Sequence, residues 1–247
     1  MRNNTRFYYT FFFACFFVFA CKKNNETGVQ CLLTEINPSG LHYALTYEND
    51  NMVSMGEGPI STRIYYNGAG QITKMEMPLK EPYRRIEFSY ASNGKVSERK
   101  SFVKQGVDWV YEGKQILIYT NNQLTSMEGY AQMVRTYTID LVWSGGNITS
   151  ITTRFAGSAA CVSTYQYDVT KTNNLAAIRD LYFKDVDETY NGYKMPFYWS
   201  KNLLIKAESS CALSETHLFS YSFTNEGLID QVFSHGQIIW SYAYDCK

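Results

Sequence analysis

The sequence is poor in the patterns that mark a familiar enzyme. Its three histidines, His42, His217 and His235, are too far apart along the chain to form a recognised metal-binding motif. It has no G-x-S-x-G turn for a serine nucleophile, no H-E-x-x-H zinc motif and no glycine-rich phosphate loop. The acidic run 185–188 has Tyr190 where a calcium loop needs glycine, so we interpret it as an exposed loop. We therefore expect no cofactor, no resident metal and no catalytic residue that the sequence alone identifies.

The chain also has no net charge, which argues against partners that bind a strongly charged protein surface. The chain has 23 basic and 23 acidic residues. A surface that follows the phosphates of a nucleic acid, or a polybasic patch on an anionic membrane, needs an excess of lysine and arginine. We therefore expect no nucleic-acid partner.

Long apolar runs are absent except at the N-terminus. A basic start precedes residues 7–20, an apolar stretch shorter than the roughly 20 residues of a membrane-spanning helix. The stretch ends in Val18-Phe19-Ala20-Cys21, which resembles the lipobox of bacterial lipoproteins. The resemblance implies cleavage after Ala20 and lipid on the Cys21 sulfur, which would anchor the protein to a membrane. An uncleaved anchor and a plain secretory signal are the alternatives.

These features divide the chain into three parts. Residues 1–20 form the lipoprotein signal, residues 21–30 form a flexible tether, and residues 31–247 form a single β-hairpin-repeat domain. The tether lacks the acidic cluster that is often associated with export to the outer face in related lipoproteins. We therefore expect a lipid-anchored protein of the cell envelope, at the outer membrane, with the leaflet left open.

Four cysteines remain beyond Cys21, an even number that fits an oxidising compartment. We predict one disulfide between Cys31 and Cys246, which ties the two ends of the domain, and a second between Cys161 and Cys211. Unpaired buried thiols are the alternative. A metal site is disfavoured, because no two of these cysteines lie close in sequence.

The most informative feature is a repeat: an aromatic residue, a few turn-forming residues, then an aliphatic residue or methionine. Gly or Asn usually comes late in the turn, where a tight reversal needs a positive φ. The copies run from Tyr47 to Met52, Tyr66 to Ile72, Tyr90 to Val96, Tyr119 to Leu124, Trp143 to Ile148, Trp199 to Leu203 and Phe223 to Leu228, with a longer variant from Tyr167 to Leu175. Each copy predicts a β-hairpin, and the chain has room for about eight.

The strand that follows each turn, which we call the incoming strand, often carries a second apolar residue three positions after its first. Examples are Ile72 with Met75 and Leu124 with Met127. In a regular strand this spacing puts the two side chains on opposite faces, whereas a β-bulge brings them to one face. The sequence leaves both arrangements open.

The predicted fold class is all-β: a long antiparallel meander of hairpins that curls into a barrel, half-barrel or sandwich-like body. A single hairpin does not bury its apolar face, whereas consecutive hairpins share one interior. One stretch departs from this pattern. Residues 175–183 have helical spacing after Asn173-Asn174, which predicts a short helix there, followed by a loop through Asn191-Gly192 and Pro196.

The turn signature is similar to the tyrosine–aspartate repeats of Rhs-type bacterial surface proteins. It looks still more like a Gram-negative lipoprotein family of unknown function with a porin-like fold. The resemblance rests on the turns above and on the stretch from Tyr167-Asp168 through Lys171-x-Asn173 to Gly192 and Ser200-Lys201-Asn202-Leu203. It covers roughly residues 31–246 and implies a porin-like fold in a cell-surface or periplasmic setting. It implies no reaction.

Aromatic residues make up 16% of the chain, and an aromatic ring on a sheet surface stacks well on sugar rings. Trp143 and Trp199 occupy the anchor position of the repeat, so we expect them in the core. Trp109 and Trp240 lie outside that position and are the candidates for stacking on a ligand. Packing between hairpins is the alternative for them.

The leading hypothesis is a membrane-anchored envelope lipoprotein that acts as a binding or structural module, with a glycan or an envelope protein as its partner. The rival is an extracytoplasmic hydrolase that acts on a glycan, with a site built from loops such as 155–161 and 183–198. Paired carboxylates for such chemistry leave no sequence signature, because they meet only in space. A passive assembly subunit is the third hypothesis.

Overall fold

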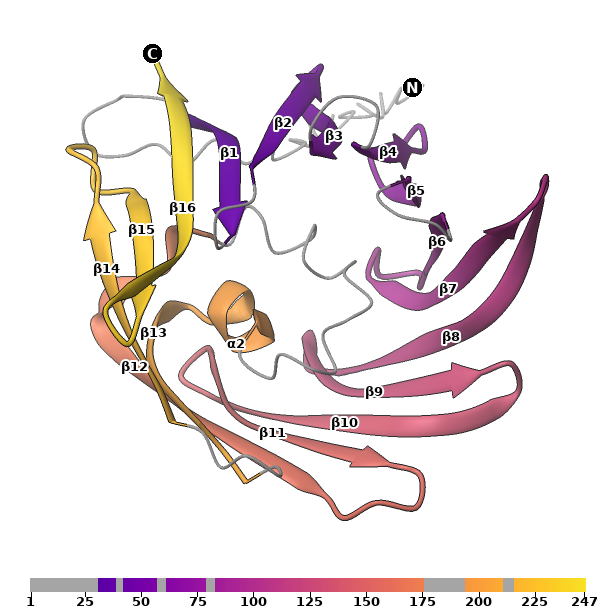
Figure 1. Ribbon diagram of the computed structural model, residues 1–247. Coiled ribbons are helices and arrows are strands. Elements are labelled where there is room, and N and C mark those ends of the chain that lie inside the picture. Colours follow the sequence, from indigo (N-terminus) through magenta and orange to yellow (C-terminus); the bar gives the residue numbers. More distant parts are fainter. Residues whose placement is uncertain (1–30, 39–41, 57–60, 79–82, 176–193, 211–215) are drawn as a thin grey trace, which may run out of the picture.

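Sixteen antiparallel strands form a closed barrel in the computed structural model, which describes residues 31–38, 42–56, 61–78, 83–175, 194–210 and 216–247. Each strand pairs with its neighbours in sequence, and β1 closes the ring by pairing with β16 (Figure 1). The strands are β1 (Cys31–Pro38), β2 (Tyr43–Glu48), β3 (Asn51–Gly56), β4 (Thr62–Tyr66), β5 (Ile72–Met77), β6 (Arg84–Tyr90), β7 (Val96–Gln105), β8 (Asp108–Thr120), β9 (Gln123–Ala131), β10 (Val134–Ser144), β11 (Asn147–Phe155), β12 (Cys161–Thr172), β13 (Asn202–Ser209), β14 (Thr216–Phe223), β15 (Ile229–Ser234) and β16 (Gln237–Cys246). The all-β meander is confirmed, and of the three predicted shapes it takes the barrel.

The repeat copies that begin at Tyr47, Tyr66, Tyr90, Tyr119, Trp143 and Phe223 each join two strands of a hairpin, as predicted. The backbone has positive φ where the sequence supplies Asn or Gly, for example 49° and 66° at Asn121 and Asn122, and 73° at Gly70. All these turns lie at one end of the barrel, because each follows a strand that runs in the same direction. We call it the turn end, and the opposite end the far end.

Two copies of the repeat do not form hairpins. Trp199 is the last residue of helix α2 (Lys194–Trp199), so the prediction of a turn from Trp199 to Leu203 is wrong, and this segment leads from a helix into β13. Tyr167 lies inside β12 rather than at its end. Pro196 lies in α2 and not in a loop, since proline is tolerated in the first helical turn. The predicted helix over 175–183 falls, apart from Leu175, outside the described residues.

A β-bulge just after the start of each incoming strand brings its two apolar residues, which are three positions apart, to the same face of the sheet. Between β4 and β5 the pairing passes from Ile72 directly to Lys74, so Thr73 is an extra residue. Ile72 and Met75 therefore both face the interior, where they are 8% and 2% exposed. The same shift occurs in β3, β7, β9, β11 and β15. The bulge is thus part of the repeat.

Aromatic side chains tie hairpins to the ones before them. A tyrosine hydroxyl or an indole N–H donates a hydrogen bond to a backbone carbonyl oxygen, in four of seven pairs that of the aliphatic residue or methionine that ends a copy of the repeat. The pairs are Tyr47 with Leu33, Tyr66 with Met52, Tyr90 with Ile72, Trp143 with Leu124, Tyr167 with Ile148, Tyr221 with Leu204 and Tyr244 with Ile229. We call these bonds the tyrosine ties. They explain why the repeat carries tyrosine or tryptophan, whose rings have both an apolar body and a polar tip.

Helix α2 lies inside the ring of strands (Figure 1). The ring of Phe197 lies 4.9 Å from that of Trp240 and 5.0 Å from that of Tyr198. Tyr198 is fully buried, with its hydroxyl 3.2 Å from that of Tyr242. At this position the interior is therefore packed with aromatic side chains.

Buried polar side chains fix α2 to the barrel wall. The Asn173 amide donates to the carbonyl oxygens of Phe197 and Ser200, and the Ser200 hydroxyl accepts a 3.0 Å bond from the Ile148 amide. Asn202 donates its backbone N–H to the Asn147 side chain at 2.9 Å. The residues that carry the family resemblance here therefore position the helix.

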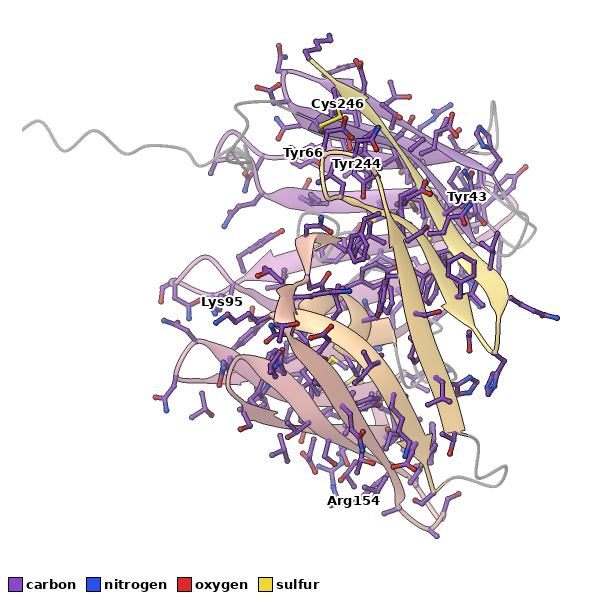
Figure 2. The ribbon with its side chains drawn as sticks, turned by 90° about the vertical axis from the view of Figure 1, so that its left-hand side faces the viewer. Tyr43, Tyr66, Lys95, Arg154, Tyr244 and Cys246 are labelled. Atoms are coloured by element: carbon purple, nitrogen blue, oxygen red, sulfur yellow. A yellow bond between two sulfur atoms is a disulfide. The ribbon has the colours of Figure 1, made fainter. Side chains whose placement is uncertain are left out.

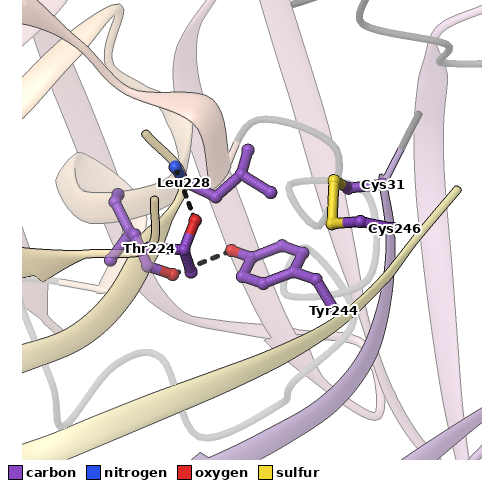
Figure 3. The surroundings of a disulfide bond; sticks show 6 residues. Cys31, Thr224, Leu228, Tyr244 and Cys246 are labelled. Carbon is purple, nitrogen blue, oxygen red and sulfur yellow. Dashed lines mark hydrogen bonds between the residues drawn. A yellow bond between two sulfur atoms is a disulfide. The ribbon is translucent and has the colours of Figure 1, made fainter. Parts of the chain in front are cut away.

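A disulfide joins Cys31 to Cys246 where β1 pairs with β16, as the sequence predicted. Figure 3 shows it near Tyr244, whose hydroxyl makes the last of the tyrosine ties. Cys161 is also disulfide-bonded, but Cys211 lies outside the described residues, so the second pairing stays a prediction.

Candidate functional site

A row of inward-facing residues crosses five strands of the barrel. Phe88, Arg99, Gln115, Gly129 and Tyr137 are successive cross-strand neighbours on β6 to β10. Cross-strand neighbours share a face of the sheet, and Phe88 belongs to the core, so the row faces inward. An arginine and a glutamine in this row are unusual, because Arg99 and Gln115 are only 5% and 9% exposed.

Gly129 makes room for the contact at the centre of this row. A Cβ at this position would lie 2.1 Å from Cε1 of Tyr137, so the tyrosine ring lies directly over the glycine backbone. The ring thereby reaches across β9 to Gln115, whose Nε2 donates a hydrogen bond to the Tyr137 hydroxyl. The Gln115 Oε1 atom is buried and has no hydrogen-bond partner among the described residues.

Arg99, Gln115 and Tyr137 line a cavity of about 340 Å³. Its lining combines charged, neutral polar and apolar residues. The lining residues are Arg84, Ile86, Arg99, Ser101, Glu112, Gly113, Lys114, Gln115, Tyr130, Ala131, Thr136 and Tyr137. Ligand pockets usually combine such a concave space with a few convergent polar groups, which makes this cavity the candidate binding site.

Four charged residues are among those that line the cavity: Arg84, Arg99, Glu112 and Lys114. The ammonium of Lys114 is bound at 3.1 Å to Glu98. Burial raises the pKa of Glu98, but hydrogen bonds from Lys114 and Lys100 outweigh it and hold that pKa below its usual value. The Lys114 charge is therefore compensated by Glu98.

The two tryptophans singled out from the sequence lie in different environments. Trp240 is 6% exposed and packs against Phe197 in the interior, where its ring serves the core. Trp109 is half-buried on the outer side of β8, with the Arg85 guanidinium 4.7 Å from its ring centroid. A stacking role for Trp109 stays a prediction.

The structure brings two of the three histidines together. The rings of His217 and His235 lie 5.7 Å apart at the far end, whereas His42 is exposed and bonded to Asn37 at 2.9 Å. Within the described ranges no three His, Cys, Asp or Glu residues gather as a metal site would require. Cys21, residues 183–193 and the acidic run 185–188 lie outside those ranges.

The cavity could not be predicted from the sequence, because its residues come from five strands. Only two signals were present. Gly129 interrupts a strand that is otherwise well formed, and glycine inside a strand marks a close approach of another group. Arg99 occupies an inward position of β7, between Glu98 and Lys100. A single charged stretch of this kind does not reveal which of its members faces inward.

The outer wall of the barrel is charged. Lys74, Glu87, Lys100 and Lys114 are successive cross-strand neighbours near the middle of β5 to β8. They alternate along their strands with core residues such as Met75, and so face outward. Ion pairs on this wall include Lys74 with Glu76 at 2.9 Å, Lys100 with Glu98 at 3.3 Å, Arg135 with Glu128 at 3.1 Å, Lys206 with Glu208 at 2.7 Å, and Arg154 with Asp140. Figure 2 shows Arg154 of this wall, and Lys95 in the turn between β6 and β7.

Two solved structures from Bacteroides share this architecture. A porin-like protein from Bacteroides uniformis aligns with a TM-score of 0.57 and 12% identity, over 87% of this chain and 95% of that one. A porin-like protein from Bacteroides vulgatus aligns with a TM-score of 0.55 and 13% identity, over 86% of this chain and 98% of that one. The fold is porin-like. No family model matches the sequence, and no curated protein matches it.

The porin-like fold confirms the fold that the turn signature implied. Identities this low support the fold alone, so activity has to be argued from the side chains. In the part of the chain that the structure describes, no helix combines the length and apolar character that crossing a bilayer requires.

Proposed function

We propose that this protein is a cell-envelope lipoprotein whose porin-like barrel stands in water beside the membrane and binds a glycan in its inner cavity. Lipid on Cys21 holds it at the outer membrane. The observation that carries the proposal is the distribution of charge: the outer wall is ionic at mid-height, whereas the interior is a packed core with a cavity that charged and polar residues partly line.

The outer wall argues against immersion in lipid. A transmembrane barrel carries an apolar band around its middle, and a single lysine or arginine at the bilayer midplane costs about 2–4 kcal/mol. Here Lys74, Lys100 and Lys114 occupy the middle of adjacent strands, together with Glu87. Such a wall is stable in water, where its ion pairs need not give up their hydration.

The interior argues against a channel. Core side chains from every part of the ring meet inside the barrel, and α2 packs among them through Phe197 and Tyr198. A barrel filled in this way supports a site rather than a path for solutes. The cavity at Gln115 supplies that site, and its polar lining suits a hydroxylated ligand.

The anchor limits the distance between the barrel and the membrane. Cys31 opens β1 at the turn end, near the Tyr47 tie to Leu33. Figure 2 shows Tyr66 and Cys246 to the left of Tyr43, the first residue of β2, which begins at the far end. The ten residues 21–30 reach at most about 36 Å when fully extended. The turn end at Cys31 therefore lies within about 36 Å of the lipid on Cys21.

The test is the location of the full chain with Cys21→Ser, compared with Lys23→Ser as the matched control. Both variants are expressed in a Gram-negative host, and membranes are separated from soluble extract without detergent. We expect the control in the membrane fraction and Cys21→Ser in the soluble fraction, folded by circular dichroism. Retention of folded Cys21→Ser in the membrane, with residues 1–20 shown by intact-mass measurement to have been removed, would show that the barrel itself enters the bilayer and would overturn the proposal.

A further inference from the structure

We propose that the inner cavity binds a glycan by its end. The terminal sugar unit enters from the far end of the barrel, and one of its hydroxyls donates a hydrogen bond to the Oε1 atom of Gln115. This inference rests on the proposed binding function, and it adds which part of the glycan is recognised and by which residue. It depends on an unpaired amide oxygen, on a floor of core residues, and on a rim at the far end.

The amide oxygen of Gln115 needs a hydrogen-bond donor. Gln115 is only 9% exposed and lines the cavity. Its Nε2 atom donates to the Tyr137 hydroxyl, whereas its Oε1 atom is buried without a partner among the described residues. A buried acceptor without a donor destabilises the protein, and a donor on the ligand removes this penalty. A sugar hydroxyl supplies such a donor, and an ionised carboxylate does not.

Core residues close the cavity on the side of the turn end. Leu117, Met127 and Ile139 are cross-strand neighbours, two positions from Gln115 and the other cavity residues on β8, β9 and β10. They face inward and are 5%, 4% and 3% exposed. The ring of strands around them is closed. A sugar chain that reaches Gln115 therefore ends there, and the unit recognised is a terminal one.

The lining of the cavity becomes exposed towards the far end. Ala131 lines the cavity and is exposed at the end of β9, the strand that begins at the turn end with Gln123. Arg84, another lining residue, is half-buried at the start of β6, the strand that runs towards the turn end. The rim of the cavity is thus formed by the far-end termini of strands, which is where the ligand enters.

The size of the cavity agrees with recognition of a terminal unit. A volume of about 340 Å³ is at the lower end of the range for ligand pockets and suits about one or two sugar rings. Tyr137 adds an aromatic ring to the lining, beside the Gln115 amide. The apolar face of a sugar packs on such a ring while its hydroxyls form hydrogen bonds.

Isothermal titration calorimetry tests the inference on the full chain, in a detergent without a sugar headgroup. The probes are four neutral sugars: D-glucose, D-galactose, D-mannose and N-acetyl-D-glucosamine. Gln115→Leu removes the amide, and Gln237→Leu at the exposed start of β16 is its matched control. Ala131→Trp fills the rim, and Ala91→Trp, at an exposed position in the turn after β6, is its control at the turn end. Circular dichroism checks the fold of each variant.

We expect at least one of the four sugars to bind at millimolar concentration, because a single unit occupies the recognised position. Gln115→Leu should weaken this binding about tenfold or more, and Ala131→Trp should weaken it at least as much. Gln237→Leu and Ala91→Trp should leave it unchanged. Unchanged binding in folded Gln115→Leu would overturn the inference, and equal weakening in Ala131→Trp and Ala91→Trp would overturn entry from the far end.

These outcomes separate the two proposals. Binding that is weakened by Ala131→Trp and not by Gln115→Leu would contradict recognition by the amide and leave the glycan-binding cavity intact. Binding that is unchanged in both folded variants would contradict the cavity as the site. No binding of any of the four sugars would contradict both the inference and the glycan as ligand, while the Cys21 experiment would still decide the anchoring. If Gln115→Leu does not fold, the wild-type titrations and Ala131→Trp still decide between these outcomes.

Discussion

The hydroxyl of Tyr66 donates a 2.7 Å hydrogen bond to the carbonyl oxygen of Met52, 14 residues earlier on the preceding hairpin. The aromatic residue that opens one turn thereby satisfies a backbone group at the start of an earlier strand. The β-bulge beside Met52 interrupts the strand ladder at that point. Repetition of this tie links consecutive hairpins into one wall.

Tyr66→Phe is the direct test of a tyrosine tie. The variant keeps the ring and leaves a partly buried carbonyl oxygen without its donor, so we expect a loss of about 1–3 kcal/mol in the free energy of unfolding. Denaturant unfolding measures it. Tyr43→Phe is the control, because the Tyr43 hydroxyl makes no hydrogen bond with the described residues. Equal losses in the two variants would contradict the role of the tie.

The tyrosine ties also predict how the stability of the folded protein changes at alkaline pH. Burial raises the pKa of Tyr47 from 10.0 to about 12, with a further contribution from Tyr66. The folded protein keeps this hydroxyl protonated while the unfolded chain ionises it, so the stabilisation is complete below about pH 10 and is lost as the pH rises towards 12. Denaturant unfolding at several alkaline pH values should show a shallower decline for Tyr47→Phe than for wild type. Identical declines would exclude Tyr47 from the effect.

Much of the barrel follows from local chemistry. Asn121-Asn122 and Gly70 adopt positive φ where the sequence predicted reversals, and six of the eight copies of the repeat join the two strands of a hairpin. The spacing of Ile72 and Met75 was ambiguous, because the bulge at Thr73 depends on the pairing of two strands. The local sequence pattern therefore predicts the strands and turns, but not how neighbouring strands are aligned.

The incorrect predictions from the sequence have a common cause, which is contact between residues that are far apart along the chain. The segment from Trp199 has the residues of a turn, but α2 precedes it inside the barrel, and the packing of Phe197 on Trp240 determines its structure. Trp240 was a candidate for ligand stacking for the same reason: nothing near it in sequence reveals that a helix will cover it. The cavity likewise joins Arg99, Gln115 and Tyr137 only through strand pairing.

Gly129→Ala tests the geometry of the cavity. The new Cβ would lie 2.1 Å from Cε1 of Tyr137, so the ring must move and lose its contact with Gln115. We expect a loss of about 1–3 kcal/mol in the free energy of unfolding, together with weaker binding of any cavity ligand. Gly68→Ala is the control, because a Cβ there meets no atom within 4 Å. A neutral Gly129→Ala would contradict the close approach.

We predict that the disulfide stabilises the seam, by which we mean the pairing of β1 with β16. Cys31 and Cys246 are separated by 215 residues, and closing a long loop reduces the entropy of the unfolded chain. The double variant Cys31→Ala with Cys246→Ala should lose about 2–5 kcal/mol in the free energy of unfolding. The substitution leaves the Cys161 disulfide in place, which chemical reduction would not do. Hydrogen exchange of β1 and β16 should also become faster, and unchanged exchange would count against a role for the disulfide at the seam.

The most direct test of a water-facing barrel is the quenching of Trp109, which lies on the outer wall beside Arg85. The full chain is bound to vesicles, and the Trp109 signal is taken as the difference between wild type and Trp109→Phe. The account predicts quenching of this signal by iodide in the aqueous phase and none by lipids brominated along their acyl chains. Quenching by the brominated lipids, with protection from iodide, would place the outer wall in the bilayer and contradict the account.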